Sequence, residues 1–289
     1  MTINFEETEY PKIDTLFMRD DRKVIIPDQF CNPLFGHLSG LKWEATEKID
    51  GTNIRVIVLP PEEDGGMVRV EFMGREEVSE IPKRLLEKLK SLFPVEKLNE
   101  VLNSGERKLY NVAVLYGEGY GVNIQKCGKR YNSKDVDFIL FDVKIGKWWL
   151  LRDNVEDIAN KLGIKVVPIV GHMTIPEAIE KVRNGFLSTE SNDKTLQAEG
   201  LVLKCPYGIC DRSGERIVTK IKTKDFRKLE ARNRNDEREL KKSGQLENGN
   251  FDEIAPTLRG VYMPLEWTPK KVEGATQKDY LKDLEGAYS

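Results

Sequence analysis

The stretch TEKIDGTNIR (residues 46–55) places a single lysine, Lys48, between two carboxylates and just ahead of a strand-like pattern. Apolar side chains alternate from Ile54 onward, which predicts a strand over residues 54–59. Gly51 has no Cβ, so the backbone can pass close to a ligand there. Lys48 is therefore expected in a bend before a strand, where it could serve as a nucleophile. A turn lysine with a salt-bridged neighbour is the alternative that this stretch alone leaves open.

Length and composition limit the classes of protein. The 289 residues, 39% hydrophobic and 33% charged, suffice for one large domain or for one domain with a small appendage. No apolar run approaches the roughly 18 residues of a membrane span, so we expect no membrane association. The acidic start MTINFEETEYPKID lacks the features of a secretion signal. Together with four scattered cysteines, this predicts a cytoplasmic protein.

Positive charge is concentrated in one region of a chain whose net charge is −2. Residues 212–242 contain twelve Lys or Arg and six Asp or Glu, a local excess of six positive charges. Such a stretch suggests a polyanionic partner that contacts one region only. A solvated helix of mixed charge, for which residues 224–242 are the candidate, is the alternative on charge alone.

The first hundred residues predict a hairpin and then helices. Alternating strands over 54–59 and 67–73 flank a turn rich in Pro and Gly, which favours an antiparallel pair. Leucines recur at helical spacing over residues 80–103, and Pro94 interrupts them. One or two helices are therefore expected to lie on the sheet.

The next segments carry a lone carboxylate and two aromatic residues. A strand over 111–115 runs into YGEGYG (residues 116–121), which is either a glycine turn with an exposed acid or a site where Glu118 faces a ligand. A further strand is expected over residues 138–143. Its alternation places Phe138 and Phe141 on opposite faces, and one of the two could be a stacking platform instead of a core residue.

The second half continues the mixture of strands and helices. Strands are expected over 148–151 and 166–170, with helices over 154–162 and 176–186. Two more strands follow over residues 199–204 and 216–222. In the last of these, Lys220 and Lys222 share one face, and like charges held that close need an anion between them or free solvent around them.

These patterns predict the fold class and the domains. We expect an α+β fold with mixed, largely antiparallel sheets and flanking helices. Residues 1–225 should form the main domain, including an irregular lead-in, and residues 226–289 a short basic, partly helical appendage. The tail is too short and too weakly patterned for a five-stranded barrel.

Six motifs in order resemble those of the covalent nucleotidyltransferase superfamily, which includes ATP-dependent ligases and mRNA capping enzymes. Within it, EKIDGTN (residues 47–53) is most similar to the RNA-repair ligases typified by the second RNA ligase of T-even bacteriophages. DNA ligases and capping enzymes typically carry arginine where this chain has Asn53. The resemblance covers about residues 40 to 225. Its motifs are Lys48-Ile49-Asp50-Gly51, Gly74-Arg75, Tyr116-Gly117-Glu118, Phe138 to Val143, Glu199-Gly200-Leu201-Val202 and Lys220-Ile221-Lys222.

The resemblance implies a ligase-type nucleotidyltransferase domain, similar to ATP-grasp domains, and three catalytic lysines. Lys48 would attack the α-phosphorus of ATP and hold AMP as a phosphoramidate. An ordinary lysine with a pKa of about 10.4 is rarely neutral at pH 7, so neighbouring cations must favour the free amine. Lys220, Lys222 and a bound Mg²⁺ (or Mn²⁺) are the candidates, and the same two lysines would neutralise the phosphates.

The resemblance also implies the residues that bind the nucleotide and the metal. Phe141 would stack on adenine, Glu118 would bind the ribose hydroxyls, and Glu199 would help to hold the divalent metal. Arg55 could contact a terminal phosphate, although a surface strand arginine is the alternative. The implied nucleotide-binding set is Glu47, Asp50, Asn53, Arg55, Arg75, Glu118, Phe141 and Glu199.

The activity expected from the resemblance is that of an ATP-dependent RNA ligase that seals 5′-phosphate and 3′-hydroxyl ends. The partner would be nucleic acid, either RNA ends or a nicked duplex, and the protein is expected to be a monomer. A DNA ligase or a capping-type guanylyltransferase is the alternative within the same chemistry. A nucleotide-binding module without catalysis is the alternative from another class.

Overall fold

The computed structural model describes residues 5–63, 65–76, 78–105 and 108–242. The chain divides into two compact units. The first comprises Met1–Leu16 and Phe30–Leu229, and the second comprises Phe17–Gln29 and Glu230–Ser289. Among the described residues, no helix combines the length and the apolar character that crossing a membrane requires.

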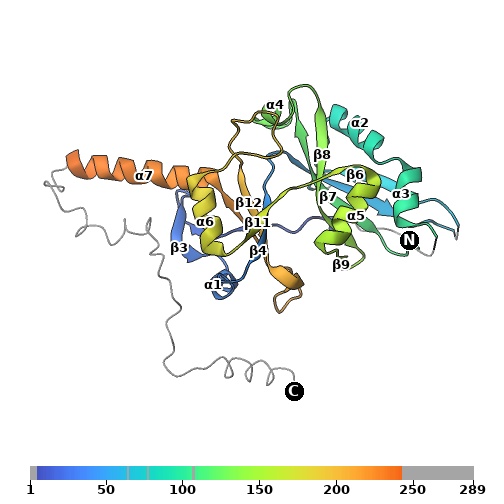
Figure 1. Cartoon of the computed structure of the whole chain (residues 1–289), viewed down its shortest axis with the longest axis horizontal. Coiled ribbons are helices and arrows are strands. Elements are labelled where there is room, and N and C mark those ends of the chain that lie inside the picture. The colour runs from blue at the N-terminus through green and yellow to red at the C-terminus, as the bar shows by residue number, and fades with distance from the viewer. Residues whose placement is uncertain (1–4, 64, 77, 106–107, 243–289) are drawn as a thin grey trace, which may run out of the picture. The chain divides into compact units, whose positions relative to one another are not determined.

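A five-stranded sheet forms one half of the first unit (Figure 1). Its outer strand β1 pairs in parallel with β13, and its other pairs are antiparallel. This sheet carries Glu47 at the end of β4 and two lysines on β13. The strand order is β1 (Asp14–Thr15), β13 (Val218–Lys222), β12 (Gly200–Lys204), β4 (Trp43–Glu47) and β11 (Ile169–Met173).

A second, six-stranded sheet forms the other half of the first unit. Only β10 and β8 pair in parallel, and β9 (Trp148–Trp149) pairs with β8 beside the main path. The order along that path is β10 (Lys165–Val166), β8 (Val136–Ile145), β7 (Ala113–Gly121), β5 (Thr52–Leu59) and β6 (Arg69–Met73).

Three helices cover one face of the second sheet and enclose the largest core (Figure 1). They are α2 (Lys83–Leu92), α3 (Val95–Leu102) and α5 (Arg152–Leu162). Pro94 separates α2 from α3, because a proline ring fits the start of a helix but not its interior. Gly163 ends α5 in the left-handed conformation, with φ of 65°. The opposite face of this sheet is thus left to line a site.

Further helices belong to the first unit. Helix α6 (Ile175–Asn184) has its start fixed by a reciprocal pair of hydrogen bonds between Thr174 and Glu177. The others are η1 (Phe5–Thr8), α1 (Pro33–His37), α4 (Gly128–Tyr131) and η2 (Pro206–Gly208).

The second unit contains one small sheet and most of a long helix. Strands β2 (Phe17–Arg19) and β3 (Ile25–Phe30) form a two-stranded sheet. Helix α7 (Thr223–Lys242) begins in the first unit and continues in the second, where Arg232 forms an ion pair with Asp20 at 2.5 Å.

The structure confirms the α+β class, the hairpin of β5 and β6, the helix break at Pro94 and the charged helix that ends at Lys242. One expectation about the strands is wrong. Residues 166–170 do not form one strand, because Pro168 separates β10 from β11 and the two belong to different sheets. Of the two interpretations left open for residues 116–121, the glycine turn is excluded, because these residues lie in β7. The expected appendage beyond Lys242 lies outside the described residues.

Candidate active site

Lys48 lies in the bend between the two sheets. Strand β4 ends at Glu47 in the first sheet, and β5 begins at Thr52 in the second. The amide of Lys48 donates a hydrogen bond to the Gly200 carbonyl at 2.9 Å. The expected position of Lys48, in a bend just before a strand, is therefore confirmed.

Gly51 permits a close approach of two strands. A Cβ at this position would lie 2.3 Å from the Gly119 carbonyl oxygen and 2.8 Å from Cγ of Glu118. Any side chain would therefore push β7 away from the bend. Gly51 also lines the cavity described next, so its lack of a Cβ serves the approach of β7 as well as the expected closeness to a ligand.

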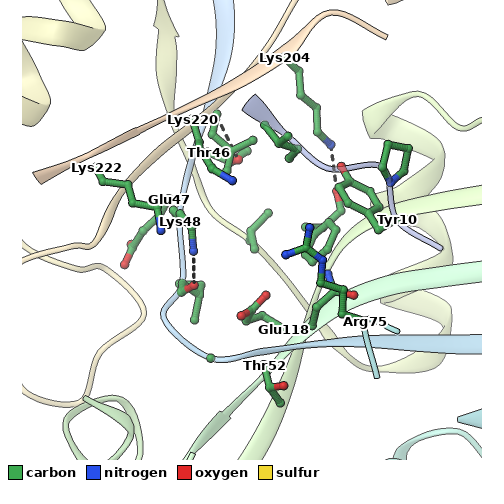
Figure 2. Close-up of a pocket in the computed structure, with 18 of the residues that line it drawn as sticks. Tyr10, Thr46, Glu47, Lys48, Thr52, Arg75, Glu118, Lys204, Lys220 and Lys222 are labelled. Carbon is green, nitrogen blue, oxygen red and sulfur yellow. Dashed lines mark hydrogen bonds between the residues drawn. The ribbon is translucent and has the colours of Figure 1, made fainter. Parts of the chain in front are cut away.

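A cavity of about 390 Å³ opens beside Lys48 and is lined by both sheets (Figure 2). Its size lies within the range of small-molecule sites. The first sheet contributes Lys204, Lys220 and Lys222, and the second contributes Asn53, Glu118 and Phe141. Tyr10, from the lead-in, and Arg75, which follows β6, complete the wall.

Glu199 joins two of the predicted lysines. Its carboxylate lies 2.5 Å from Nζ of Lys48 and 2.8 Å from Nζ of Lys222. Burial lowers the pKa of Lys48, but the charges of Glu199, Glu118 and Asp50 outweigh it, so the pKa of Lys48 is raised above its usual value. The expectation that cations around Lys48 favour its neutral amine is thus wrong for the protein by itself, because carboxylates dominate its surroundings.

Lys220 has the opposite electrostatic environment. Burial lowers its pKa to about 8, and the positive charges of Lys222, Lys48 and Arg75 add to that effect, while Asp14 opposes it. An anion in the cavity would therefore stabilise the protonated form of Lys220, since it would relieve the repulsion between these cations.

Two other polar residues of the cavity are unusual, Glu118 in its pKa and Asn53 in its hydrogen bonding. Burial, reinforced by Glu199 and opposed by Lys48, raises the pKa of Glu118 to about 7. The Oδ1 atom of Asn53 is buried and accepts no hydrogen bond. A buried polar atom without a partner is rare in proteins, so this oxygen indicates a place for a ligand donor.

Phe141 lies at an irregularity of β8. Tyr116 pairs with Asp142 and Gly117 with Leu140, so Phe141 is the extra residue of a β-bulge. Phe138 packs in the main core, while Phe141 lines the cavity. The predicted opposite placement of the two rings is confirmed, and Phe141 is the one exposed to a ligand.

Sequence reasoning missed a charged cluster behind Phe141. Asp142, which is 1% exposed, accepts two hydrogen bonds from Arg216, each 3.0 Å long, and one of 2.8 Å from the Tyr10 hydroxyl. Lys204 lies 3.2 Å from the same carboxylate and donates to the Phe141 carbonyl at 2.9 Å. A carboxylate inside the apolar run 138–143 was the available signal, because buried acids are almost always paired.

Arg55 is not brought to the cavity. Its side chain is fully buried, with 0% exposure, and donates hydrogen bonds to the carbonyls of Gly74 and Phe5 and to the Thr8 hydroxyl. Both expectations for this residue, a phosphate contact and a surface arginine, are therefore corrected. Arg55 instead holds the N-terminal segment against the second sheet.

Of two further predicted residues, Asp50 and Glu47, only Glu47 lines the cavity. Asp50 does not line the cavity, and its amide donates to the Tyr131 hydroxyl at 3.4 Å. Glu47 lines the cavity, but its carboxylate accepts hydrogen bonds from Ser188 and Thr189. The structure thus places Asp50 and Arg55 outside the cavity, and Glu199 beside it through its ion pairs with two lining lysines. The predicted residues that line the cavity are Glu47, Lys48, Asn53, Arg75, Glu118, Phe141, Lys220 and Lys222.

Comparison with known proteins gives one family and several solved structures. A family model named RNA ligase matches residues 41–222, which is more than half of the 289-residue chain. A variant of Naegleria gruberi RNA ligase with ATP and Mn is 21% identical, with a TM-score of 0.47 over 68% of this chain and 53% of that one. The same ligase with PPi is 20% identical, with a TM-score of 0.45 over 74% and 61%. This chain therefore spans less than two thirds of either structure.

Proposed function

Because the chain belongs to the RNA ligase family, we propose that it is an ATP-dependent RNA ligase that joins 5′-phosphate and 3′-hydroxyl ends. The observation that supports this most is the position of the Lys48 amine, which lies in one cavity with the basic residues Lys220 and Lys222. A nucleoside triphosphate suits a space of this size that is surrounded by an amine, a set of cations and an aromatic ring.

The reaction would proceed in three group transfers. The Lys48 nitrogen forms a bond to the α-phosphorus of ATP, and the bond to pyrophosphate breaks. The AMP then passes to the 5′-phosphate of an RNA end, which frees the lysine. Finally, a 3′-hydroxyl attacks that activated phosphorus, the phosphodiester bond forms, and AMP leaves.

Lys48 must lose a proton before it can attack. In the protein by itself the Glu199 carboxylate, 2.5 Å away, stabilises the protonated form. A cationic partner for Glu199 would therefore make Lys48 more nucleophilic, and Lys222, 2.8 Å from the same carboxylate, already shares that position.

Glu199 fits a divalent metal that arrives with the nucleotide. Among the residues that the structure describes, no three His, Cys, Asp or Glu side chains converge as a metal cluster. Mg²⁺ usually binds through one or two carboxylates together with substrate phosphates, so Glu199 would suffice as the protein ligand. When bound, the metal would neutralise phosphate oxygens and compete with Lys48 for Glu199.

The remaining cavity residues would bind the parts of ATP. Phe141 would stack on adenine, Glu118 would bind the ribose hydroxyls, and Arg75 would contact ribose or phosphate. The unpartnered Oδ1 of Asn53 would accept a hydrogen bond from the nucleotide. Lys220 and Lys222 would neutralise the α-phosphate and the departing pyrophosphate.

Within the family, we propose the RNA-repair type typified by the second RNA ligase of T-even phages. Asn53 stands two positions after Gly51, where DNA ligases and capping enzymes typically have arginine. Residues 1–225 would form the adenylyltransferase domain. The basic residues of α7 would contact the nucleic-acid backbone, which predicts salt-sensitive and largely sequence-independent binding.

Intact-mass spectrometry with ATP and Mg²⁺ tests this function. We expect an AMP adduct on Lys48, no adduct with GTP, and sealing of a nick in RNA when the adduct is chased with nicked duplexes. An adduct formed from GTP would favour a guanylyltransferase. Sealing of nicked DNA alone would favour a DNA ligase. A protein that binds ATP and forms no adduct would be a nucleotide-binding module.

The affinity for AMP should fall as the pH rises from 7 to 9. Lys220, with a pKa of about 8, is mostly charged at pH 7 and mostly neutral at pH 9, so the cavity loses positive charge. The loss should approach about tenfold if Lys220 contacts the phosphate. Calorimetric titration of wild type and of Lys220→Arg would measure it. The arginine stays charged, so its profile should be flatter, and an equal decline in both proteins would exclude Lys220 as the cause.

A further inference from the structure

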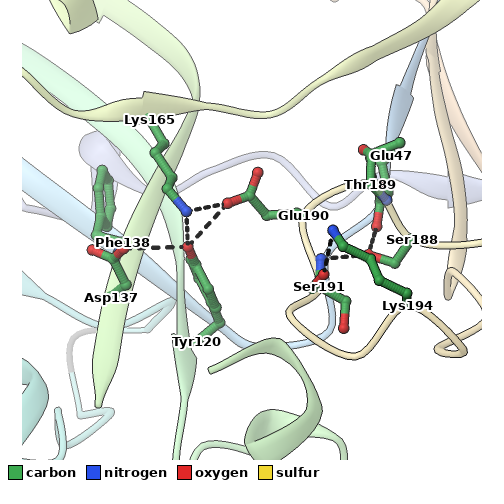
Figure 3. A network of polar contacts seen from close by, with 10 residues as sticks. All are labelled: Glu47, Tyr120, Asp137, Phe138, Lys165, Ser188, Thr189, Glu190, Ser191 and Lys194. Atoms are coloured by element: carbon green, nitrogen blue, oxygen red, sulfur yellow. Dashed lines mark hydrogen bonds and ion pairs between the residues drawn. The ribbon is translucent and has the colours of Figure 1, made fainter. Parts of the chain in front are cut away.

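The loop of residues 187–197 has no role in the proposed chemistry, yet it lies beside Glu47, the residue directly before Lys48 (Figure 3). It follows α6 and leads into β12. A bridge between Leu187 and Gln197 closes its base, and the Ser188 amide donates to the Leu196 carbonyl at 2.8 Å. The loop is therefore a closed unit with a defined shape.

The loop provides the hydrogen bonds for Glu47, the residue directly before Lys48. Glu47 is 1% exposed, and a buried carboxylate is costly unless hydrogen bonds compensate for the lost water. Its Oε1 accepts from Ser188 Oγ at 2.5 Å, and its Oε2 accepts from the amide and the hydroxyl of Thr189 at 2.9 and 2.8 Å. The end of β4 is thus fixed to the loop by three bonds to one charge.

The same loop is attached to the second sheet. Glu190 lies 3.3 Å from the hydroxyl of Tyr120 on β7 and forms an ion pair with Lys165 on β10 (Figure 3). Lys165 also donates to the Tyr120 hydroxyl at 3.2 Å. Because Glu47 belongs to the first sheet, the loop joins the two sheets on either side of the Lys48 bend.

A third attachment reaches the other side of Lys48. The Ser191 hydroxyl donates to the Arg130 carbonyl at 2.7 Å, and the Asn192 amide donates to the Tyr131 carbonyl at 3.1 Å. Tyr131 in turn accepts a hydrogen bond from the Asp50 amide. The loop therefore fixes the backbone both before and after Lys48, through Glu47 and through Tyr131.

We propose that the 187–197 loop is a positioning element for Lys48. Thr189 of the loop holds the Glu47 carboxylate, and Glu47 in turn is the positioning residue that fixes the backbone of Lys48. The proposal rests on the proposed function of Lys48 as the nucleophile. An in-line attack on phosphorus requires the amine at a defined place, and a misplacement of about 1 Å can cost on the order of a hundredfold in rate. Hydrogen bonds to a buried charge are strong enough to fix that place.

Single-turnover formation of the AMP adduct, followed across ATP concentrations, tests the proposal. Thr189→Val removes one hydroxyl bond to Glu47 and keeps the shape of the side chain. Thr195→Val is the matched control, because its hydroxyl donates to Asp193 in the same loop and accepts from the Arg130 side chain, but does not contact Glu47. We expect Thr189→Val to lower the maximal rate about tenfold, with half-saturating ATP changed less than about twofold, and Thr195→Val to behave as wild type.

A double-mutant cycle separates positioning from general damage. Glu47→Leu and the double variant with Thr189→Val should react at similar rates, because Glu47→Leu already removes every hydrogen bond between Glu47 and Thr189. If Glu47→Leu does not fold, Ser188→Ala with Thr189→Val replaces it in the cycle, and the rate losses of these two substitutions should not simply add. Three outcomes would each overturn the proposal. They are a wild-type maximal rate for Thr189→Val, an equal fall in the maximal rate of Thr195→Val, and a change in the half-saturating ATP concentration with no change in the maximal rate. A wild type that forms no adduct would instead overturn the proposed function.

Discussion

Lys48→Arg is expected to abolish the AMP adduct. Arginine keeps the positive charge and can keep the ion pair with Glu199, which lies 2.5 Å from the lysine nitrogen. A guanidinium does not lose its proton in proteins, so it cannot attack phosphorus. Because the change removes only the nucleophile, folding and nucleotide binding should persist. Intact-mass spectrometry after incubation with ATP and Mg²⁺ measures the adduct.

The same variant should still join an RNA end that already carries 5′-linked AMP. That final step requires a 3′-hydroxyl and the charged groups of the cavity, but no lysine nucleophile. Gel analysis of such a preactivated nick distinguishes a specific loss from a misfolded protein. An adduct that survives in Lys48→Arg would show that another residue accepts the AMP.

Asp142→Asn should cause a large loss of stability. Asp142 is 1% exposed and binds both Arg216 and Lys204, so the substitution leaves two cations near an uncharged amide. Removal of one partner from a buried ionic group costs about 3–5 kcal/mol in the free energy of unfolding. Denaturation with urea measures this loss. Asp157→Asn is the control, because Asp157 forms an ion pair with Lys161 on the surface. The side chains of Lys161 and Asp157 are 37% and 55% exposed, and surface pairs contribute less than about 1 kcal/mol.

The contribution of Asp142 should also depend on pH. Burial raises its pKa, but Lys204 and Arg216 outweigh burial, and the net pKa is lowered from the ordinary value of 3.8. A lowered pKa in the folded state stabilises the protein above the ordinary value, and this contribution disappears as the pH falls toward the folded-state pKa. Wild type should therefore lose stability below about pH 4 more steeply than Asp142→Asn. Similar stabilities of the two proteins at pH 7 would contradict the assigned role of the cluster.

The six motifs were recognisable because each is local. Lys48 directly precedes a recognisable strand. Lys220 and Lys222 share one face of a strand, and Phe141 lies on the face opposite Phe138, as the two-residue period of a strand requires. The same period could not assign Arg55. Alternation shows that Arg55 and Ile54 face opposite ways, but not which face meets the cavity, and Arg55 is buried against the N-terminal segment.

The sequence by itself determined the class of the fold, most of the strands and helices that follow Lys48, and the candidate residues for the chemistry, because these depend on residues within a few positions of one another. The tertiary structure alone decided which residues share the cavity and what holds them there. Glu47 meets Ser188 across 141 positions, and Asp142 meets Tyr10 across 132. Such pairs satisfy buried charges, and no local pattern specifies the partner, since only the packing of the two sheets brings the donors within hydrogen-bond distance.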